Sequence, residues 1–115
     1  MKNIALFVFN GDPMCFIHVL LNAHDMSEKG INVQVVVEGA AVKLIPGLAK
    51  PENPLNKMWE SAKSKGLIAG VCRACSSKLG TLKDAEAQAL TLLDGMSGHP
   101  SMLSYMDEGY EVVTF

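Results

Sequence analysis

Several features are scarce or absent in this sequence, and each absence excludes a class of protein. Basic residues are not in excess, because 10 lysines and arginines stand against 12 aspartates and glutamates, for a formal charge of −2. Proteins that bind nucleic acid phosphates carry a basic surface, so no nucleic acid partner is expected. Asp12, His18, Asn22 and Lys43 interrupt every apolar run before the roughly 18 to 20 residues that cross a bilayer. We therefore expect no membrane segment and no membrane partner.

Nucleotide motifs and a disulfide framework are also absent. Neither G-x-G-x-x-G nor G-x-x-x-x-G-K-S/T occurs, and without these phosphate cradles no cofactor is expected. The three cysteines are an odd number in a chain that starts at Met1, which favours a reducing compartment over a disulfide scaffold. The apolar run that follows Lys2 is shorter than that of a secretory signal. The sequence thus predicts a cytoplasmic protein.

The residues that are present suit one α/β domain, predicted over residues 1–115. Of the 115 residues, 49% are hydrophobic and 19% are charged, enough to fill one core. Apolar runs predict strands at 3–9, 31–37, 67–71, 90–93 and 110–115. Helical patterns lie between them at 13–29, 40–45, 53–65, on either side of Gly80, and at 100–107. This alternation predicts a three-layer sandwich, with a mostly parallel five-stranded sheet and helices on both faces.

Finer features of these elements can also be predicted. The strand at 31–37 alternates polar and apolar residues before it becomes wholly apolar, which suggests a position near an edge. Pro46 is expected to end the short helix before it. Thr81 and Asp84 have the spacing of a capping box, and Pro100 suits the first turn of a helix.

Polar residues follow each of the first four predicted strands. Parallel strands end at one edge of the sheet, which is where α/β proteins bind ligands. We expect one cleft there, and its predicted lining is Asn10, Gly11, Asp12, Glu38, Arg73, Asp94 and His99, beside Cys72.

Cys72 and Cys75 form a C-x-x-C motif at a transition from strand to helix. Free N–H groups at a helix start, together with Arg73, would lower the pKa of a thiol. Cys72 ends the strand and Cys75 lies in the first turn, so we expect Cys72 to be the more nucleophilic and Cys75 to be its resolving partner or a passive neighbour. Such a thiolate can attack a disulfide, accept sulfur as a persulfide, or ligate a metal. The spacing does not choose between them.

The arrangement of these elements resembles the DsrE/DsrF-like family of small sulfur-relay proteins over the whole chain. The features that carry the resemblance are a cysteine that ends the third strand, a helix closed by Gly80 and a capped second helix. The resemblance implies that Cys72 carries sulfur as a persulfide. It also implies a trimer or hexamer and a protein that donates or accepts the sulfur. Cys75 departs from the family pattern, because many relatives have a serine or another small residue there.

Two alternatives from other classes stay open. Cys72, Cys75 and His99, with Cys15 as a fourth ligand, would suit a soft metal such as zinc or copper(I). The chain would otherwise be a subunit without catalysis whose pocket binds a small ligand. A thioredoxin-like oxidoreductase fits poorly, because no proline directly precedes the fourth or fifth predicted strand.

The first predicted helix carries more apolar surface than one sheet face requires. From Met14 to Leu21 it is apolar almost all round. Such an excess is typical of a contact between subunits. The residues themselves therefore predict a homo-oligomer.

Overall fold

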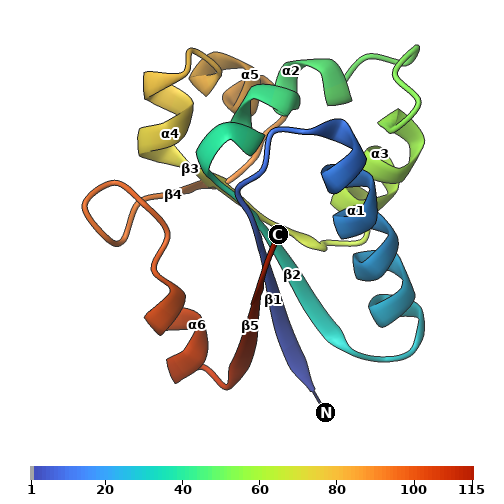
Figure 1. The fold of residues 1–115 in the computed structure, drawn as a ribbon, viewed down its shortest axis with the longest axis vertical. Helices are drawn as coiled ribbons and strands as arrows, with labels where there is room; N and C mark the ends of the chain where they lie inside the picture. The colour runs from blue at the N-terminus through green and yellow to red at the C-terminus, as the bar shows by residue number, and fades with distance from the viewer. Residues whose placement is uncertain (1) are drawn as a thin grey trace.

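The computed structural model describes residues 2–115, and Met1, the predicted start of the chain, lies outside the described residues. Five strands form one sheet in the order β4-β3-β2-β1-β5, and every neighbouring pair is parallel. The strands are β1 (Asn3–Val8), β2 (Asn32–Val37), β3 (Ile68–Cys72), β4 (Leu92–Leu93) and β5 (Tyr110–Thr114). The predicted parallel sheet is confirmed (Figure 1).

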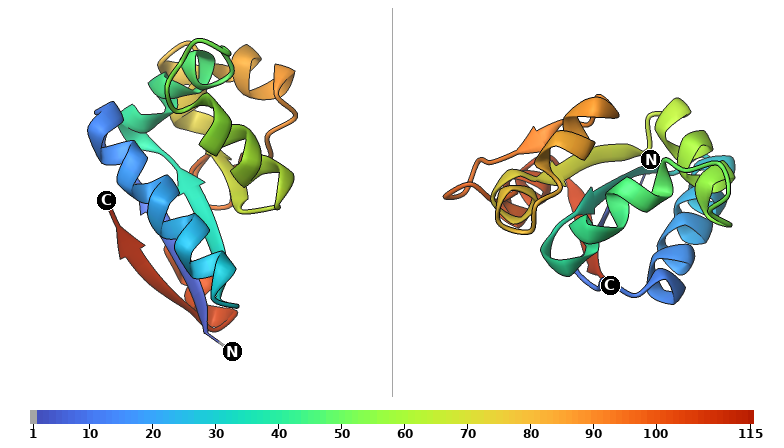
Figure 2. Two further views of the ribbon diagram at one scale, coloured as in Figure 1. Left: turned by 90° about the vertical axis from the view of Figure 1, so that its right-hand side faces the viewer. Right: turned by 90° about the horizontal axis from the view of Figure 1, so that it is seen from above.

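Helices connect the strands and cover both faces of the sheet. They are α1 (Pro13–Glu28), the 3-10 helix η1 (Gly39–Leu44), α2 (Ile45–Leu48), α3 (Asn56–Ser64), α4 (Arg73–Lys78), α5 (Leu82–Ala87) and α6 (Met102–Asp107). Figure 2 shows α1 running along the sheet beside β1 and β2. Within residues 2–115, none of the helices has the length and apolar character that a membrane crossing requires.

Alternate residues of β1 build a core on each face of the sheet. Leu6 faces α1 and α3, where Phe16 packs against Trp59 with ring centroids 5.9 Å apart. Phe7 faces α6 on the other side and meets Tyr105 edge-on, with centroids 5.5 Å apart. Burying one such side chain contributes about 1.5 to 3 kcal/mol. Because both faces are covered, β1 reads as an unbroken apolar run.

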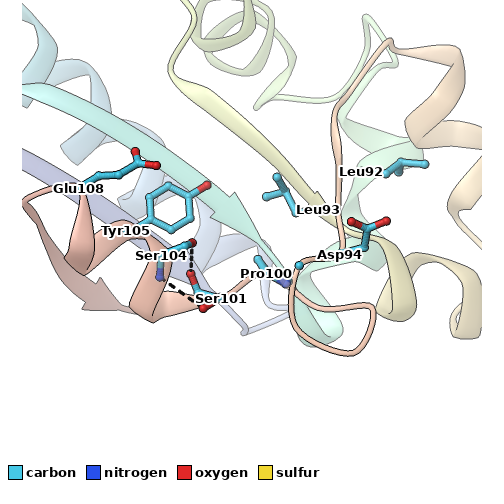
Figure 3. Close-up of a pocket in the computed structure, with 9 residues that line it drawn as sticks. Leu92, Leu93, Asp94, Pro100, Ser101, Ser104, Tyr105 and Glu108 are labelled. Carbon is cyan, nitrogen blue, oxygen red and sulfur yellow. Dashed lines mark hydrogen bonds between the residues drawn. The ribbon is translucent and has the colours of Figure 1, made fainter.

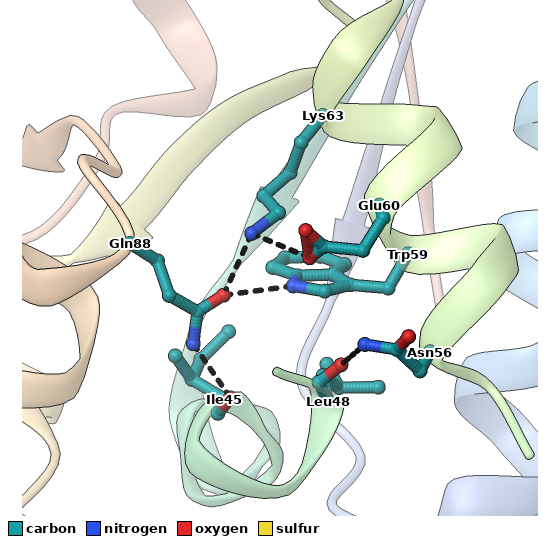
Figure 4. A network of polar contacts seen from close by, with 7 residues as sticks. All are labelled: Ile45, Leu48, Asn56, Trp59, Glu60, Lys63 and Gln88. Carbon is teal, nitrogen blue, oxygen red and sulfur yellow. Dashed lines mark hydrogen bonds and ion pairs between the residues drawn. The ribbon is translucent and has the colours of Figure 1, made fainter. Parts of the chain in front are cut away.

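A polar network joins α3 to the end of α5 above the larger core (Figure 4). The indole N–H of Trp59 donates to Oε1 of Gln88 at 2.9 Å, and Nε2 of Gln88 donates to the carbonyl of Ile45 at 2.9 Å. Nζ of Lys63 also donates to Oε1 of Gln88, at 3.1 Å. The network satisfies polar groups that burial would otherwise leave without partners.

The structure corrects the predicted place of the second strand. β2 is the middle strand of the sheet, with β3 and β1 on its two sides. The alternation at its start comes from Asn32, which is exposed where the strand begins, and from Gln34, which is half-buried. Polar residues at one end of a strand therefore do not indicate an edge.

The structure differs from the predictions based on proline and threonine at three helix boundaries. Pro46 lies in the first turn of α2, where no backbone N–H donor is needed. It therefore belongs to the start of a helix, whereas the sequence predicted that it would end one. Thr81 precedes α5, but its ψ of 11° is not the extended value of a cap, and its side chain makes no capping bond. Pro100 lies outside α6, whose cap is Ser101.

Candidate functional site

The candidate site lies where neighbouring strands send the chain to opposite faces of the sheet. After β3 the chain enters α4 and α5, and Ala85 of α5 joins the core that contains Trp59. After β4 the chain leads to α6, whose Tyr105 joins the core on the other face. Ligand sites of parallel α/β sheets form at such points, at the carboxyl ends of the strands.

Two thiols and one imidazole meet at this point. Cys72 ends β3, Cys75 lies in the first turn of α4, and His99 belongs to the loop between β4 and α6. Nδ1 of His99 lies 3.1 Å from Sγ of Cys72 and 3.8 Å from Sγ of Cys75. The sequence placed His99 near Cys72 from topology alone, and this proximity is confirmed.

Two backbone amides, one from α4 and one from the segment after β2, point at the sulfur atoms. The amide of Cys75 donates to Sγ of Cys72 at 3.3 Å, and the amide of Gly39 donates to Sγ of Cys75 at 3.3 Å. Gly39 has a φ of +60°, a conformation that glycine adopts readily. Sequence reasoning missed the Gly39 amide, although Glu38 and Gly39 were recognised as the residues that follow β2.

Burial governs the protonation of Cys72. Its side chain is fully buried at 0% exposure, and this loss of solvent raises the pKa of the thiol from 9.0 to about 12. The amide of Cys75 acts in the opposite direction, while the Cys75 thiol and Glu38 raise the pKa further. The expected lowering of the Cys72 pKa by the helix start is therefore wrong, because desolvation outweighs one amide.

Burial also affects Glu38, which follows β2. It raises the pKa of the Glu38 carboxyl above its ordinary value, and the nearby His99 acts against this rise. Glu38 is half-buried and thus contributes to the polarity of the space around the imidazole.

The loop of residues 94–99 is fastened to the start of α4. The amide of Ala74 donates to the carbonyl of Gly98 at 2.9 Å, and the thiol of Cys72 lies 3.7 Å from the same oxygen. Arg73 pairs with Asp94 at 3.1 Å, with both side chains about half exposed. These contacts hold His99 against the sulfur atoms.

The predicted residues after β1 contact one another, the start of α1 and η1. Asp12 caps α1 by accepting from the amide of Met14 at 2.9 Å, and Asn10 accepts from the amide of Asp12 at 2.8 Å. Gly11 lies so close to η1 that a Cβ on it would be 3.0 Å from the carbonyl oxygen of Ala40. Cys15 lies in α1, partly buried, and within residues 2–115 it is outside the cluster of Cys72, Cys75 and His99.

Two cavities flank the start of α6. The larger, of about 470 Å³, is lined by Leu92, Leu93, Asp94, Gly95, Pro100, Ser101, Ser104, Tyr105 and Glu108 (Figure 3). The second, of about 340 Å³, is lined by Phe9, Glu38, Met96, Pro100, Ser101, Met102 and Leu103. Asp94 and Glu38 therefore border different cavities, and neither cavity includes Cys72 or Asn10.

The geometry suits thiol chemistry with a local proton acceptor. When Nδ1 of His99 is unprotonated, it can accept the proton of Cys72 over the observed distance of 3.1 Å. The second thiol lies in the same cluster, all of whose ligand atoms are within 4.8 Å of one another. The three groups can therefore support attack on a sulfur atom or hold a soft metal ion.

Comparison with known proteins places the chain among small proteins of the same fold. Residues 4–115 match the DsrE/DsrF-like family. An uncharacterized protein of Methanocaldococcus jannaschii is 32% identical over 96 residues, covering 84% of this chain and 76% of the relative. One from Archaeoglobus fulgidus is 46% identical over 37 residues, covering 32% of this chain and 100% of the relative. A conserved protein of unknown function from Bacteroides thetaiotaomicron shares the fold, with a TM-score of 0.74 at 15% identity over 99% of this chain and 95% of the other.

Proposed function

Because this chain belongs to the DsrE/DsrF-like family, we propose that it is a sulfur-relay protein whose Cys72 and Cys75 accept sulfur as a persulfide and pass it on. The observation that carries the proposal is the contact of 3.1 Å between His99 and Cys72, with a second thiol beside it. A relay requires a nucleophilic sulfur, an acceptor for its proton, and a way to release the sulfur again.

The exposure of the two thiols determines which of them reacts first in this proposal. Cys75 is partly exposed and Cys72 is buried, so a donor persulfide meets Cys75 first. The Cys75 thiolate attacks the terminal sulfur, forms the Cys75 persulfide and releases the donor thiolate. Cys72 then gives its proton to His99 and attacks the same terminal sulfur, which moves to Cys72 and frees the Cys75 thiolate. Cys72 thus keeps the carrier role that the resemblance implies.

Cys75 can also act as the resolving thiol. Its thiolate attacks the inner sulfur of the Cys72 persulfide, a disulfide between the two cysteines forms, and hydrosulfide leaves. This reaction releases sulfur when no acceptor protein is bound.

Intact mass spectrometry after exposure to glutathione persulfide tests the proposal. We expect a gain of one sulfur atom that reductant removes, located by peptide mapping on Cys72 or Cys75. Slow resolution to the disulfide would appear as a loss of two hydrogen atoms. Cys72→Ser/Cys75→Ser should gain no sulfur, and Cys15→Ser should behave like the wild type. Sulfur found only on Cys15, or no gain at all, would contradict the relay.

The proposal includes a homo-oligomer, a trimer or hexamer by family resemblance. Apolar side chains on α1 and α6 support it, with Met14 69% and Leu103 63% exposed. Apolar surface of this kind is typical of subunit contacts. Light scattering at micromolar concentration should give a multiple of 12.4 kDa, and a mass near 12.4 kDa itself would contradict the proposal.

The proposal also places the protein in the cytoplasm with a sulfur donor or acceptor protein as partner. Its three free cysteines support a reducing compartment, in which persulfide chemistry is not lost to stable disulfides.

A further inference from the structure

We propose that Cys72, Cys75 and His99 form a zinc site with two thiolates, one imidazole and one open coordination position. The inference goes beyond sulfur relay and does not depend on it. Its basis is that three soft or borderline ligands from two separate segments converge without a disulfide between the cysteines. Sulfur and imidazole nitrogen are the ligands that zinc selects over hard cations such as magnesium or calcium.

The distances suit tetrahedral coordination. With bonds of about 2.3 Å to sulfur and about 2.0 Å to nitrogen, a tetrahedral site places a sulfur and a nitrogen ligand about 3.6 Å apart. Nδ1 of His99 lies 3.1 Å from one sulfur and 3.8 Å from the other, on either side of this value. Shifts of about half an ångström or less would bring both distances to this value.

The surroundings suit a metal bound through thiolates. Amides of Cys75 and Gly39 already donate to the two sulfur atoms, and such outer contacts orient the ligands of zinc sites. Two thiolates and a neutral imidazole balance the charge of Zn²⁺. The resulting neutral unit can be buried at less cost than a lone thiolate.

Three protein ligands leave the fourth position open. Within residues 2–115, the cluster holds no fourth histidine, cysteine or carboxylate, and Cys15 is not part of it. Closed structural zinc sites use four protein ligands, whereas sites with three keep one position for water or an exogenous ligand. Cys75 and His99 are both partly exposed, whereas Cys72 is buried, so an external ligand would reach the metal from the side of Cys75 and His99. An external thiolate is the ligand class that this position would take.

Zinc binding to this site exchanges protons for the metal ion. One Zn²⁺ displaces the two thiol protons of Cys72 and Cys75 and bonds to both sulfur atoms and to Nδ1 of His99. No electron is transferred, so the reaction needs no oxidant or reductant. The bound species therefore has the mass of the protein plus one zinc minus two hydrogens.

Native mass spectrometry of the reduced, metal-stripped full chain with one equivalent of Zn²⁺ tests the site. We expect one bound zinc with the loss of two protons, and protection of Cys72 and Cys75, but not Cys15, from alkylation. Replacing Zn²⁺ by Co²⁺ should give thiolate-to-cobalt charge-transfer absorption. Cys75→Ser and His99→Gln should each weaken binding more than about tenfold, since even outer contacts change zinc affinity 10- to 100-fold.

Matched controls separate the site from general metal binding. Cys15→Ser removes a thiol outside the cluster, and His18→Ala removes an exposed imidazole on α1. Both should bind zinc as the wild type does, and circular dichroism checks that every variant is folded. Absence of a zinc species in the reduced wild type would overturn the proposal, as would equal binding by Cys75→Ser and His99→Gln. If the protein gains sulfur but binds no zinc, the zinc site is wrong and the proposed relay stands. If it binds zinc but gains no sulfur, the relay is wrong and the zinc site stands.

Discussion

Nδ1 of His99 lies 3.1 Å from Sγ of Cys72, although 27 positions separate the two residues in the chain. The contact exists because parallel strands β3 and β4 end side by side, one with the cysteine and the other with the loop that carries the histidine. The same contact helps to bury the thiol. His99 therefore both accepts the proton of Cys72 and shields its sulfur from solvent.

Alkylation should reach Cys72 last of the three cysteines. A substoichiometric iodoacetamide probe at neutral pH requires an exposed thiolate, and Cys72 is buried with a raised pKa whereas Cys75 and Cys15 are partly exposed. Peptide mapping over time measures the order. First labelling at Cys72 would show that the loop of residues 94–99 opens readily in solution.

Stability should fall at alkaline pH because of Cys72. Its pKa of about 12 in the folded chain exceeds the ordinary 9.0, so the unfolded state loses the proton first as the pH rises. The contribution is complete below pH 9 and is lost as the pH rises toward 12, with a slope of at most about 1.4 kcal/mol per pH unit. Urea midpoints at pH 8 to 10 measure it. Cys72→Ala should flatten the decline, and Cys15→Ala should keep it.

Gly70→Ala should destabilise the chain by about 1 to 3 kcal/mol. Gly70 in β3 has a φ of +154°, and a Cβ there would collide with the carbonyl oxygen of Thr91 before β4. Because β4 leads into the loop that covers Cys72, the variant should also speed alkylation of Cys72. Gly95→Ala is the control, since a Cβ at Gly95 meets no atom within 4 Å. Equal urea midpoints for both variants would contradict the close approach of the strands.

Thr81→Val should leave stability unchanged or raise it by up to about 2 kcal/mol. The hydroxyl of Thr81 is buried and has no hydrogen-bond partner among residues 2–115, and a methyl group of similar size removes the desolvation cost. Thermal unfolding compares it with Ser101→Ala, which loses the bond of 3.3 Å from the Ser104 amide and should cost about 0.5 to 2 kcal/mol. A clear loss for Thr81→Val would mean that the hydroxyl has a partner in solution.

Gln88→Leu should destabilise the chain by about 1 to 3 kcal/mol, because it leaves the indole N–H of Trp59 and the carbonyl of Ile45 without partners. Glu60→Gln removes only a half-exposed partner of Lys63 and should change stability by less than about 1 kcal/mol. Urea unfolding of both variants makes the comparison, and the reverse order would contradict the role of Gln88 in Figure 4.

The fold could be predicted because its signals are local and repeated. Apolar runs such as that of β1 mark strands that are covered on both faces, and parallel order then brings Cys72 and His99 to one edge. The place of β2 could not be predicted in this way. Its first residues are polar because the beginning of β2 is accessible to solvent. An alternation of polar and apolar residues looks the same in such a strand and in a strand at the edge of a sheet.

The chemistry of the thiols was harder to predict than their positions. The sequence showed a helix start at Cys72, which lowers a pKa, but not the loop that removes solvent from the sulfur, which raises it more. The amide of Gly39 could not be predicted, because every residue except proline has a backbone N–H. Only the folded structure shows that this N–H points at Sγ of Cys75.

The carbonyl oxygen of Gly98 accepts from the Ala74 amide and faces the Cys72 thiol. One short segment therefore both closes over the sulfur and carries the imidazole beside it. A motion of this segment that uncovers Cys72 would also withdraw His99 from it, so exposure of the thiol to bulk water and contact with its base exclude one another. If the chain relays sulfur as proposed, Cys72 is activated only while it is shielded, and the protein that takes the sulfur must already be in contact with this segment.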